Sequence, residues 1–241
     1  MSLSGKTVLI TGGALRIGRS LALAIAQAGG DVVLHYGKSQ KEAEGTQAEI
    51  QAAGRKAFLL QADLADATQV AKLISRAEEY APLFALVNNA SIFEPIGWEE
   101  TSLKQWNLAM MVNLTTPFLL GQAFARSLEP GGNGRIINLI DWRALRPGPD
   151  HLPYTISNSA LAALTRSLAV ALAPGITVNG LALGAILPPS DGVPTKVNLE
   201  QIPARRWAKL EEVGQALVFL LDGPAYITGE IIHIDGGRHL V

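Results

Sequence analysis

Short apolar runs alternate with helical segments along the chain, and this alternation restricts the possible folds more than any other feature of the sequence. Several of the runs are continuously apolar, as expected of strands that are covered on both faces. Such repetition predicts an α/β fold, a doubly wound and mostly parallel sheet with helices on both faces. The predicted strands are Thr7–Thr11, Asp31–Tyr36, Lys56–Gln61, Phe84–Asn88, Arg135–Ile140, Ile176–Leu181 and Ile231–Ile234.

Helix boundaries are marked between these strands. The helix over Arg19–Ala28 is expected to end at Gly29–Gly30, because glycine readily adopts the left-handed conformation that closes many helices. Ser39–Glu42 and Asp66–Gln69 have the spacing of capping boxes, in which the two end residues satisfy free N–H groups reciprocally. Each pair therefore predicts the start of a helix.

Composition narrows the class of protein. A length of 241 residues suits one domain over 1–241 better than two small domains. Lys and Arg total 20 against 21 acidic residues, so no basic excess indicates a nucleic acid or an anionic membrane as partner. The chain has no cysteine, which excludes disulfides, thiolate catalysis and cysteine-bound metals. We expect a cytoplasmic protein and assign no metal ligand.

Two long uncharged stretches, Trp106–Ala125 and Ser167–Ser190, need an explanation other than a membrane span. Polar residues interrupt the first, and prolines and glycines interrupt the second, whereas membrane spans are nearly continuous apolar runs. We interpret both as buried helix and strand.

The most irregular part of the chain follows a late strand. Residues 185–205 are rich in proline and glycine. Ligands of doubly wound sheets bind outside the carboxyl ends of the strands, so this stretch is a candidate substrate lid.

A glycine-rich turn follows the first strand and precedes a helix, at Thr11–Gly18. Glycines let the backbone approach a pyrophosphate closely, and the helix N-terminus supplies N–H donors and a positive dipole end. A lone turn of this kind also suits an ordinary strand–helix connection. Its place after the first strand of a long alternation favours nucleotide binding.

The end of the second strand indicates which nucleotide is bound. An acid there would bind the ribose 2′-hydroxyl of NAD, whereas a basic residue accommodates the 2′-phosphate of NADP. The segment Leu34–Ser39 has no acid and includes Lys38, which favours NADPH. Lys38 could instead be a solvated turn residue, and Ser39 could act as helix cap as well as phosphate ligand.

Further motifs occur in an order that resembles the short-chain dehydrogenase/reductase family over essentially the whole chain. They are Asn88–Ala90, Asn113, Tyr154, Tyr226–Gly229 and Asp235–Gly237. The resemblance implies a seven-stranded Rossmann-type sheet, a nicotinamide cofactor and usually a homotetramer. The cofactor-binding residues that it implies are Gly12, Arg16, Ile17, Gly18, His35, Tyr36, Lys38, Ser39, Asp63, Leu64, Asn89, Ala90 and Gly184.

Within that family the pattern is most similar to the pteridine reductases. Arg16 stands where most members have glycine, His35–Ser39 resembles their 2′-phosphate segment, and Asp141 replaces the usual catalytic serine. Phe93 matches the aromatic residue that stacks on a pterin ring in those enzymes, and stacking suits a flat heterocycle. Arg16 is expected near both the pyrophosphate and the substrate. Phe93 could alternatively be a core residue.

Two positions depart from the family pattern. The motif lysine, four residues after Tyr154, is Asn158, and the usual Pro-Gly pair is Leu183–Gly184. One helical turn separates Tyr154 from Asn158, so both are expected to face one pocket, where Asn158 could bind a ribose hydroxyl. In the family the lysine lowers the pKa of the tyrosine. Without it Tyr154 should stay protonated near pH 7, which suits a reductase.

The expected catalytic residues are therefore Tyr154, Asp141, Asn113 and Asn158. Asp141 could supply the proton if burial raises its pKa, or it could simply pair with Arg143 or Arg146, either of which could replace the missing cation. The leading hypothesis is an NADPH-dependent reductase of a pterin or related C=N or C=O substrate. The alternatives are a ketoreductase for a small or acyl-linked ketone, and a cofactor-binding protein weakened by the loss of the lysine.

The helix after Tyr154 is the candidate subunit interface. Over Ser159–Ala173 its residues are small and apolar around much of the circumference. Such a helix needs burial on several sides, and a neighbouring subunit of the homotetramer could provide one of them.

Overall fold

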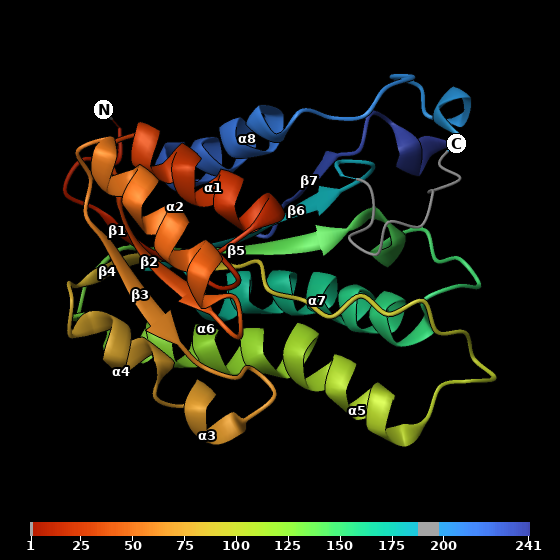
Figure 1. Ribbon diagram of the computed structural model, residues 1–241, viewed down its shortest axis with the longest axis horizontal. Coiled ribbons are helices and arrows are strands. Elements are labelled where there is room, and N and C mark those ends of the chain that lie inside the picture. Colours follow the sequence, from red (N-terminus) through yellow and green to blue (C-terminus); the bar gives the residue numbers. More distant parts are fainter. Residues whose placement is uncertain (1, 188–197) are drawn as a thin grey trace.

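A parallel β-sheet forms the centre of the protein, whose computed structural model describes residues 2–187 and 198–241 (Figure 1). The strand order is β3-β2-β1-β4-β5-β6-β7, and all neighbouring strands are parallel. This confirms the single doubly wound α/β domain. The strands are β1 Thr7–Ile10, β2 Asp31–Tyr36, β3 Ala57–Gln61, β4 Leu83–Asn88, β5 Gly134–Asp141, β6 Ile176–Leu183 and β7 Ile231–Ile234.

Helices cover both faces of the sheet (Figure 1). One layer holds α1 (Arg16–Gln27), α2 (Gln40–Ala52) and α8 (Leu210–Asp222). The chain order reverses on the two sides of β1, whose neighbours are β2 and β4, so a ligand crevice is expected at their carboxyl ends. The remaining helices are α3 Ala67–Val70, α4 Leu73–Glu78, α5 Leu103–Met110, α6 Thr116–Ser127 and α7 Leu152–Ala171.

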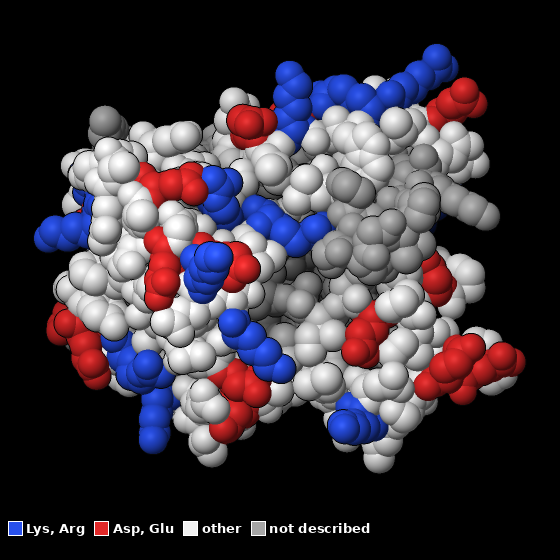
Figure 2. All heavy atoms as spheres, viewed as in Figure 1, with Lys and Arg blue, Asp and Glu red and all other residues white. Residues whose placement is uncertain are grey.

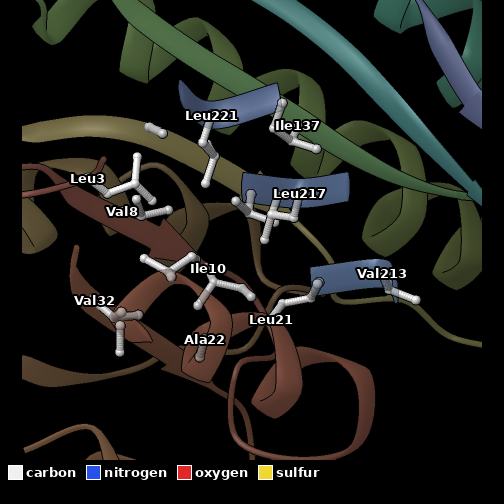
Figure 3. Packing of buried hydrophobic residues seen from close by; sticks show 14 of the residues in the cluster. Leu3, Val8, Ile10, Leu21, Ala22, Val32, Ile137, Val213, Leu217 and Leu221 are labelled. Carbon is white, nitrogen blue, oxygen red and sulfur yellow. The ribbon is translucent and has the colours of Figure 1, made fainter. Parts of the chain in front are cut away.

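The first core cluster joins α1 and α8 to the sheet. Leu21 of α1 and Leu217 of α8 are fully buried beside Ile10 of β1 (Figure 3). Each buried side chain of this size contributes about 1.5–3 kcal/mol. Gly214 lets the two helices approach closely, since a Cβ there would lie 2.8 Å from the Cβ of Ala24. The apolar strands predicted from sequence are thus covered by helices, as their composition requires.

The second cluster explains the long apolar stretch near the middle of the chain. Helices α5 and α6 are joined by a π-helical turn over Met111–Thr115. Among the described residues, Leu103–Ser127 is the one helical stretch long and apolar enough to cross a membrane. Leu120 and Phe124 are fully buried in the core, so this stretch packs as a core helix.

Some local predictions need correction. Helix α1 begins at Arg16 rather than Arg19, because it starts directly within the glycine-rich turn. Ser39 precedes α2 but its side chain makes no capping bond, and its backbone (φ −89°, ψ 59°) is not extended as a capping residue requires. Asp66 does cap α3, because its side chain accepts from the N–H of Thr68. The side-chain oxygen of Gln69 accepts from the backbone N–H of Asp63, and not from that of Asp66 as a capping box requires.

Charged side chains of both signs are interspersed over the face shown in Figure 2, with a hollow at its centre and basic side chains at the margin of the hollow. This distribution matches the near balance of 20 basic and 21 acidic residues. Of the lid predicted over 185–205, residues 188–197 lie outside the described residues.

Candidate cofactor and active site

A pocket of about 330 Å³ lies where the strand order of the sheet reverses, at the carboxyl ends of β1, β2 and β4. The glycine-rich turn and the first turn of α1 form one wall, and the segments that follow β2 and β4 form the others. This is the crevice in which doubly wound sheets bind ligands. The pocket is lined by Gly12, Ala14, Leu15, Arg16, Ile17, Gly18, Tyr36, Gly37, Ser39, Asn89, Ala90 and Ser91.

Two glycines of the turn cannot be replaced without displacing backbone. Gly12 has a φ of 63°, a conformation that side chains disfavour. A Cβ on Gly18 would lie 2.0 Å from the carbonyl oxygen of Gly12 and 2.7 Å from Nδ2 of Asn89. The close approach places the N-terminus of α1 at the pocket, where its N–H groups can bind a phosphate anion.

The turn is attached to β4 by a set of hydrogen bonds. The hydroxyl oxygen of Thr11 accepts from the N–H groups of Asn89 and Ala90, both at 3.0 Å. The amide of Asn89 donates to the carbonyl oxygens of Thr11 at 2.8 Å and Gly12 at 3.1 Å. Asn89 and Ala90, predicted as cofactor residues, therefore shape the pocket as well as line it.

The segment after β2 supplies the predicted 2′-phosphate residues. Tyr36 and Ser39 line the pocket, and Lys38 between them is exposed. Arg16 lines the pocket from the start of α1, with a φ of 55°. His35 is buried instead, beneath the turn. Arg16 at the start of α1 and Tyr36 and Ser39 at the end of β2 thus line the pocket from two sides.

The two residues predicted after β3 have different environments. Asp63 is exposed, and its carboxylate accepts from the N–H of Ala65 at 2.9 Å. Leu64 is buried, and its carbonyl oxygen accepts from the hydroxyl of Thr116 at 2.9 Å. Leu64 is thereby joined to α6.

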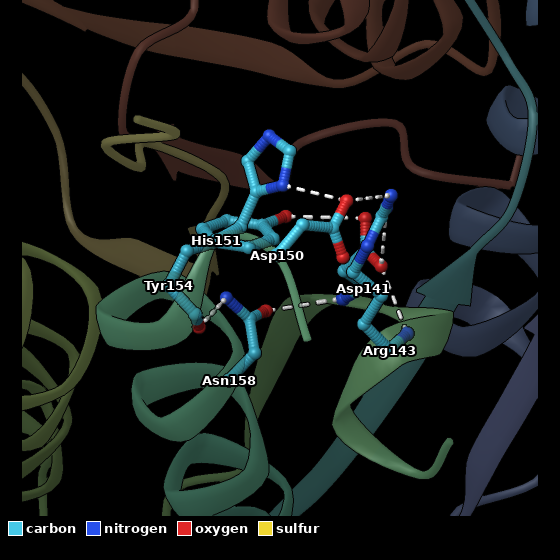
Figure 4. Close-up of polar contacts among 6 residues, drawn as sticks. All are labelled: Asp141, Arg143, Asp150, His151, Tyr154 and Asn158. Carbon is cyan, nitrogen blue, oxygen red and sulfur yellow. Dashed lines mark hydrogen bonds and ion pairs between the residues drawn. The ribbon is translucent and has the colours of Figure 1, made fainter. Parts of the chain in front are cut away.

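Tyr154 of α7 and Asp141 at the end of β5 meet as a pair (Figure 4). The hydroxyl of Tyr154 donates to Oδ2 of Asp141 at 3.3 Å. The N–H of Arg143 donates to the other carboxylate oxygen at 2.8 Å. The geometry brings together the two residues that the sequence assigns to proton transfer.

Burial dominates the electrostatics of this pair. It raises the pKa of Asp141, although the N–H and the charge of Arg143 act in the opposite direction. Burial, and next the negative charge of Asp141, raise the pKa of Tyr154 well above its ordinary value. Tyr154 therefore keeps its proton at neutral pH, as the missing lysine led us to expect. The pair is suited to donating a proton rather than to abstracting one.

Asn158 lies one turn after Tyr154 and makes two hydrogen bonds within the protein. It is 3% exposed, and its Oδ1 accepts from the N–H of Asp141 at 3.0 Å. Its amide nitrogen donates to the carbonyl oxygen of Tyr154 at 3.1 Å. These bonds join Asn158 to the backbones of Asp141 and Tyr154, while one N–H of its amide is left for a further partner, so its contact with a ribose hydroxyl stays a prediction.

Arginines supply positive charge near Asp141. Arg143 Nη1 lies 3.7 Å from Asp141 Oδ1, and Nη2 lies 3.4 Å from Asp150 Oδ2. Asp141 therefore pairs with Arg143 and also contacts Tyr154, so the two interpretations of Asp141 are compatible. Arg146 donates to the carbonyl oxygen of Arg238 at 3.3 Å. The positive charge of Arg238 also lowers the pKa of Asp141, although by less than Arg143 and Tyr154 do.

Phe93 stands beside the proton-donating pair and is 44% exposed, which argues against the core interpretation. Its ring stacks on His151 with centroids 4.1 Å apart, and the Tyr154 ring meets it edge-on at 4.7 Å. His151 Nδ1 lies 2.9 Å from Asp150 Oδ2. We did not predict His151, Asp150 or Arg238. His151 directly precedes α7 with a φ of 55°, so helical spacing does not account for its contact with Phe93.

Asn113 and Gly184 position neighbouring segments. Asn113 lies in the π-helical turn, where its amide exchanges two hydrogen bonds with the backbone of Ile92 and donates to Ser157 of α7. Asn113 thus fixes the segment that carries Phe93. At the end of β6, a Cβ on Gly184 would lie 2.6 Å from the Cα of Asp235, so the two chain segments require glycine there.

A doubly wound parallel sheet, a glycine-rich turn at its switch point and a tyrosine on α7 beside the end of β5 are typical of a Rossmann-type oxidoreductase. Comparison with known proteins agrees, because residues 13–239 match the family described as enoyl-(acyl carrier protein) reductase. The chain belongs to the short-chain dehydrogenase/reductase family.

Individual relatives carry different activities. The chain is 33% identical to a 3-oxoacyl-[acyl-carrier-protein] reductase from Synechocystis over 98% of both chains. It is also 33% identical to gluconate 5-dehydrogenase from Gluconobacter oxydans, covering 98% of this chain and 95% of that protein. The crystal structure of FolM alternative dihydrofolate reductase 1 from Brucella suis, in complex with NADP, superposes with a TM-score of 0.90 at 34% identity, covering 98% and 96% of the chains.

Proposed function

We propose that the protein is an NADPH-dependent reductase of a pterin or a related substrate with a C=N or C=O bond. The observation that carries the proposal is the contact of Tyr154 with Asp141 at 3.3 Å, beside the half-exposed ring of Phe93. Burial raises the pKa of Tyr154 well above its ordinary value, so its hydroxyl keeps the proton, and burial also raises the pKa of Asp141. The site therefore combines an acid with an aromatic surface.

The residues of the pocket fit NADPH. A Cβ on Gly18 would collide with the turn, so the backbone of α1 can approach a pyrophosphate closely there. Lys38 and Ser39 would bind the 2′-phosphate, and Arg16 would extend its planar guanidinium toward the pyrophosphate. The NADP complex of the Brucella suis protein supports the same cofactor here. When bound, NADPH supplies the hydride.

The protein residues then supply the proton. For a C=N substrate, the Tyr154 hydroxyl would give its proton to the nitrogen. Asp141, whose Oδ2 accepts from that hydroxyl, would in its protonated form return a proton to Tyr154 or protonate a ring nitrogen directly, and would regain its own proton from solvent. Asn158 keeps the two groups in register through their backbones.

Phe93 favours a flat heterocyclic substrate. Its ring already stacks on the imidazole of His151, so the site accommodates parallel aromatic rings. The Brucella suis relative is an alternative dihydrofolate reductase, which agrees in substrate class. Asn113, through Ile92, fixes the segment on which this surface depends.

A ketoreductase for a small or acyl-linked ketone is the second candidate, favoured by the Synechocystis relative that matches over 98% of both chains. Loss of the motif lysine at Asn158 supports the third, a weakened cofactor-binding protein. In each case we propose a cytoplasmic homotetramer. The outward face of α7, where Val170 is 83% exposed, supports an interface on that helix.

Oxidation of NADPH against a panel of dihydropterins, quinonoid pterins and small ketones distinguishes the three functions. Steady turnover with a pterin is expected. Turnover with ketones alone would establish the ketoreductase, and NADPH binding without turnover of any compound would establish the binding protein.

A further inference from the structure

His35 is a buried histidine that the proton-transfer chemistry leaves unused. It is the second-last residue of β2, directly before the segment proposed to bind the 2′-phosphate. Its side chain is 2% exposed and lies beneath the glycine-rich turn, away from solvent. A polar ring in such a place needs partners for both nitrogens, and those partners show what it does.

The ring joins three strand ends. The N–H of Gly12, after β1, lies 3.2 Å from Nδ1, and the carbonyl oxygen of Ala62, after β3, lies 3.1 Å from Nε2. A backbone N–H can only donate and a carbonyl can only accept. Nδ1 is therefore the acceptor and Nε2 carries the hydrogen, so the contacts select one neutral tautomer.

The neutral form is strongly favoured. Burial lowers the pKa of His35 to about 4, while the carbonyl of Ala62 raises it by a smaller amount. Two charged neighbours act in opposite directions, since Arg76 lowers the pKa and Asp63 raises it. At neutral pH the lone pair of Nδ1 is thus available to Gly12.

The peptide groups of the turn are held from opposite sides by these contacts. On the β4 side the amide of Asn89 donates to the Gly12 carbonyl oxygen at 3.1 Å. On the β2 side His35 accepts from the Gly12 N–H, and its own carbonyl oxygen accepts from the N–H of Gly13 at 3.0 Å. Gly12 is kept at a φ of 63°, and its carbonyl oxygen is the atom against which Gly18 packs.

We infer that His35 is a positioning residue for the pyrophosphate turn, acting through the bond from the Gly12 N–H to Nδ1. Its bond to Gly12 commits that N–H to the protein, so the N–H groups at the start of α1 are the ones presented to an anion. This role is distinct from contact with the 2′-phosphate, and it rests on the proposed NADPH function.

Two substitutions test the hydrogen bonds of the two ring nitrogens separately. In His35→Asn the side-chain oxygen can take the place of Nδ1 and accept from Gly12. In His35→Gln the side-chain NH₂ can take the place of Nε2 and donate to Ala62, leaving the Gly12 N–H without its acceptor. NADPH affinity is measured by fluorescence titration, and hydrogen exchange of the Gly12 amide is measured by NMR without ligand.

The expected result is a loss of affinity of about tenfold for His35→Gln and less than about threefold for His35→Asn, typical of one backbone hydrogen bond. KM for NADPH should rise in His35→Gln with little change in kcat at saturation. Without ligand, the Gly12 amide should exchange slowly in the wild type and in His35→Asn, and quickly in His35→Gln.

Equal affinity and equal exchange in His35→Gln and the wild type would overturn the inference. So would a wild-type ¹⁵N spectrum showing the hydrogen on Nδ1, a measurement that needs no variant to fold. If the wild type bound no NADPH but the exchange pattern held, the turn would be positioned as inferred and the proposed function would be wrong.

Discussion

The cofactor pocket and the proton-donating site lie at the same edge of one sheet but are built differently. The pocket consists largely of backbone, in which Gly12 and Gly18 make a close contact and Asn89 and His35 hold the peptide groups in place. The site that we propose donates the proton consists of side chains, with Tyr154 and Asp141 as a partly buried pair.

The difference explains where the chain departs from its family. A backbone pocket depends on residues that determine the path of the chain. Gly12 and Gly18 follow the family pattern, whereas Arg16 stands at a φ of 55° where most members have glycine. In a site made of side chains, the hydrogen bonds can be redistributed when one residue is replaced. With the lysine replaced, the Asn158 amide bonds two backbone groups, and a carboxylate and Arg143 take up the polar positions around Tyr154.

The largest expected effect is in the side-chain site. Tyr154→Phe removes the proton donor, so turnover should fall by roughly 10²–10⁴-fold, while NADPH affinity should stay within about twofold of the wild type. Steady-state kinetics and fluorescence titration measure the two quantities. Tyr226→Phe is the matched control, because Tyr226 is fully exposed and should change neither. Comparable turnover in both variants would remove Tyr154 from the chemistry.

The next largest effect is a pH-dependent loss of folding stability at His35, beneath the backbone pocket. The pKa of His35 is about 4 in the folded protein against an ordinary 6.5, so the unfolded chain binds the proton first. The stability that neutral His35 contributes is present above pH 6.5 and is lost as the pH falls toward 4, by about 3 kcal/mol in total. Arg76 and Asp63 are the charged groups that act on it.

Urea unfolding of the wild type and of His35→Asn at pH 7 and pH 4 tests this contribution. The wild type should lose more stability between the two pH values than the variant, which has no titrating ring at this position. Parallel losses in the two proteins would mean that other groups account for the acid sensitivity.

These two regions also differ in how far the sequence could predict them. The strands and the glycine-rich turn follow from local patterns, because apolar runs and glycine positions determine backbone paths directly. The sequence also suggested a contact of Asp141 with Tyr154, beside the alternative of a pairing with Arg143 or Arg146. It did not indicate that Asn158 would bond to the N–H of Asp141, or that His35 would lie beneath the turn, because both depend on competition among partners distant in the chain.

Lys38→Ala tests the charged contact that we propose to the 2′-phosphate. Loss of a charge-assisted bond to the 2′-phosphate should weaken NADPH binding by about 1.5–3 kcal/mol and leave NADH binding unchanged. Calorimetry with both nucleotides measures the preference. Lys72→Ala, at another exposed lysine, should leave it intact. A preference retained in Lys38→Ala would assign nucleotide choice to other residues.

The smallest effect is expected at Asn158. Asn158→Ala removes both bonds of the amide, which should lower the free energy of unfolding by about 1–3 kcal/mol and reduce kcat less than Tyr154→Phe does. Denaturant unfolding and kinetics measure the two changes, with the exposed Asn107→Ala as control. A collapse of kcat with unchanged stability would show that Asn158 contacts the reacting groups.

The central claim is that the partly buried pair of Asp141 and Tyr154 protonates a heterocycle. It is tested most directly by NADPH oxidation with a dihydropterin and with a ketone, in the wild type and in Asp141→Ser, which restores the residue usual in the family. The account predicts dihydropterin turnover by the wild type that falls at least about tenfold in Asp141→Ser, with ketone turnover unchanged or raised. Dihydropterin turnover that is absent in the wild type, or undiminished in Asp141→Ser, would contradict it.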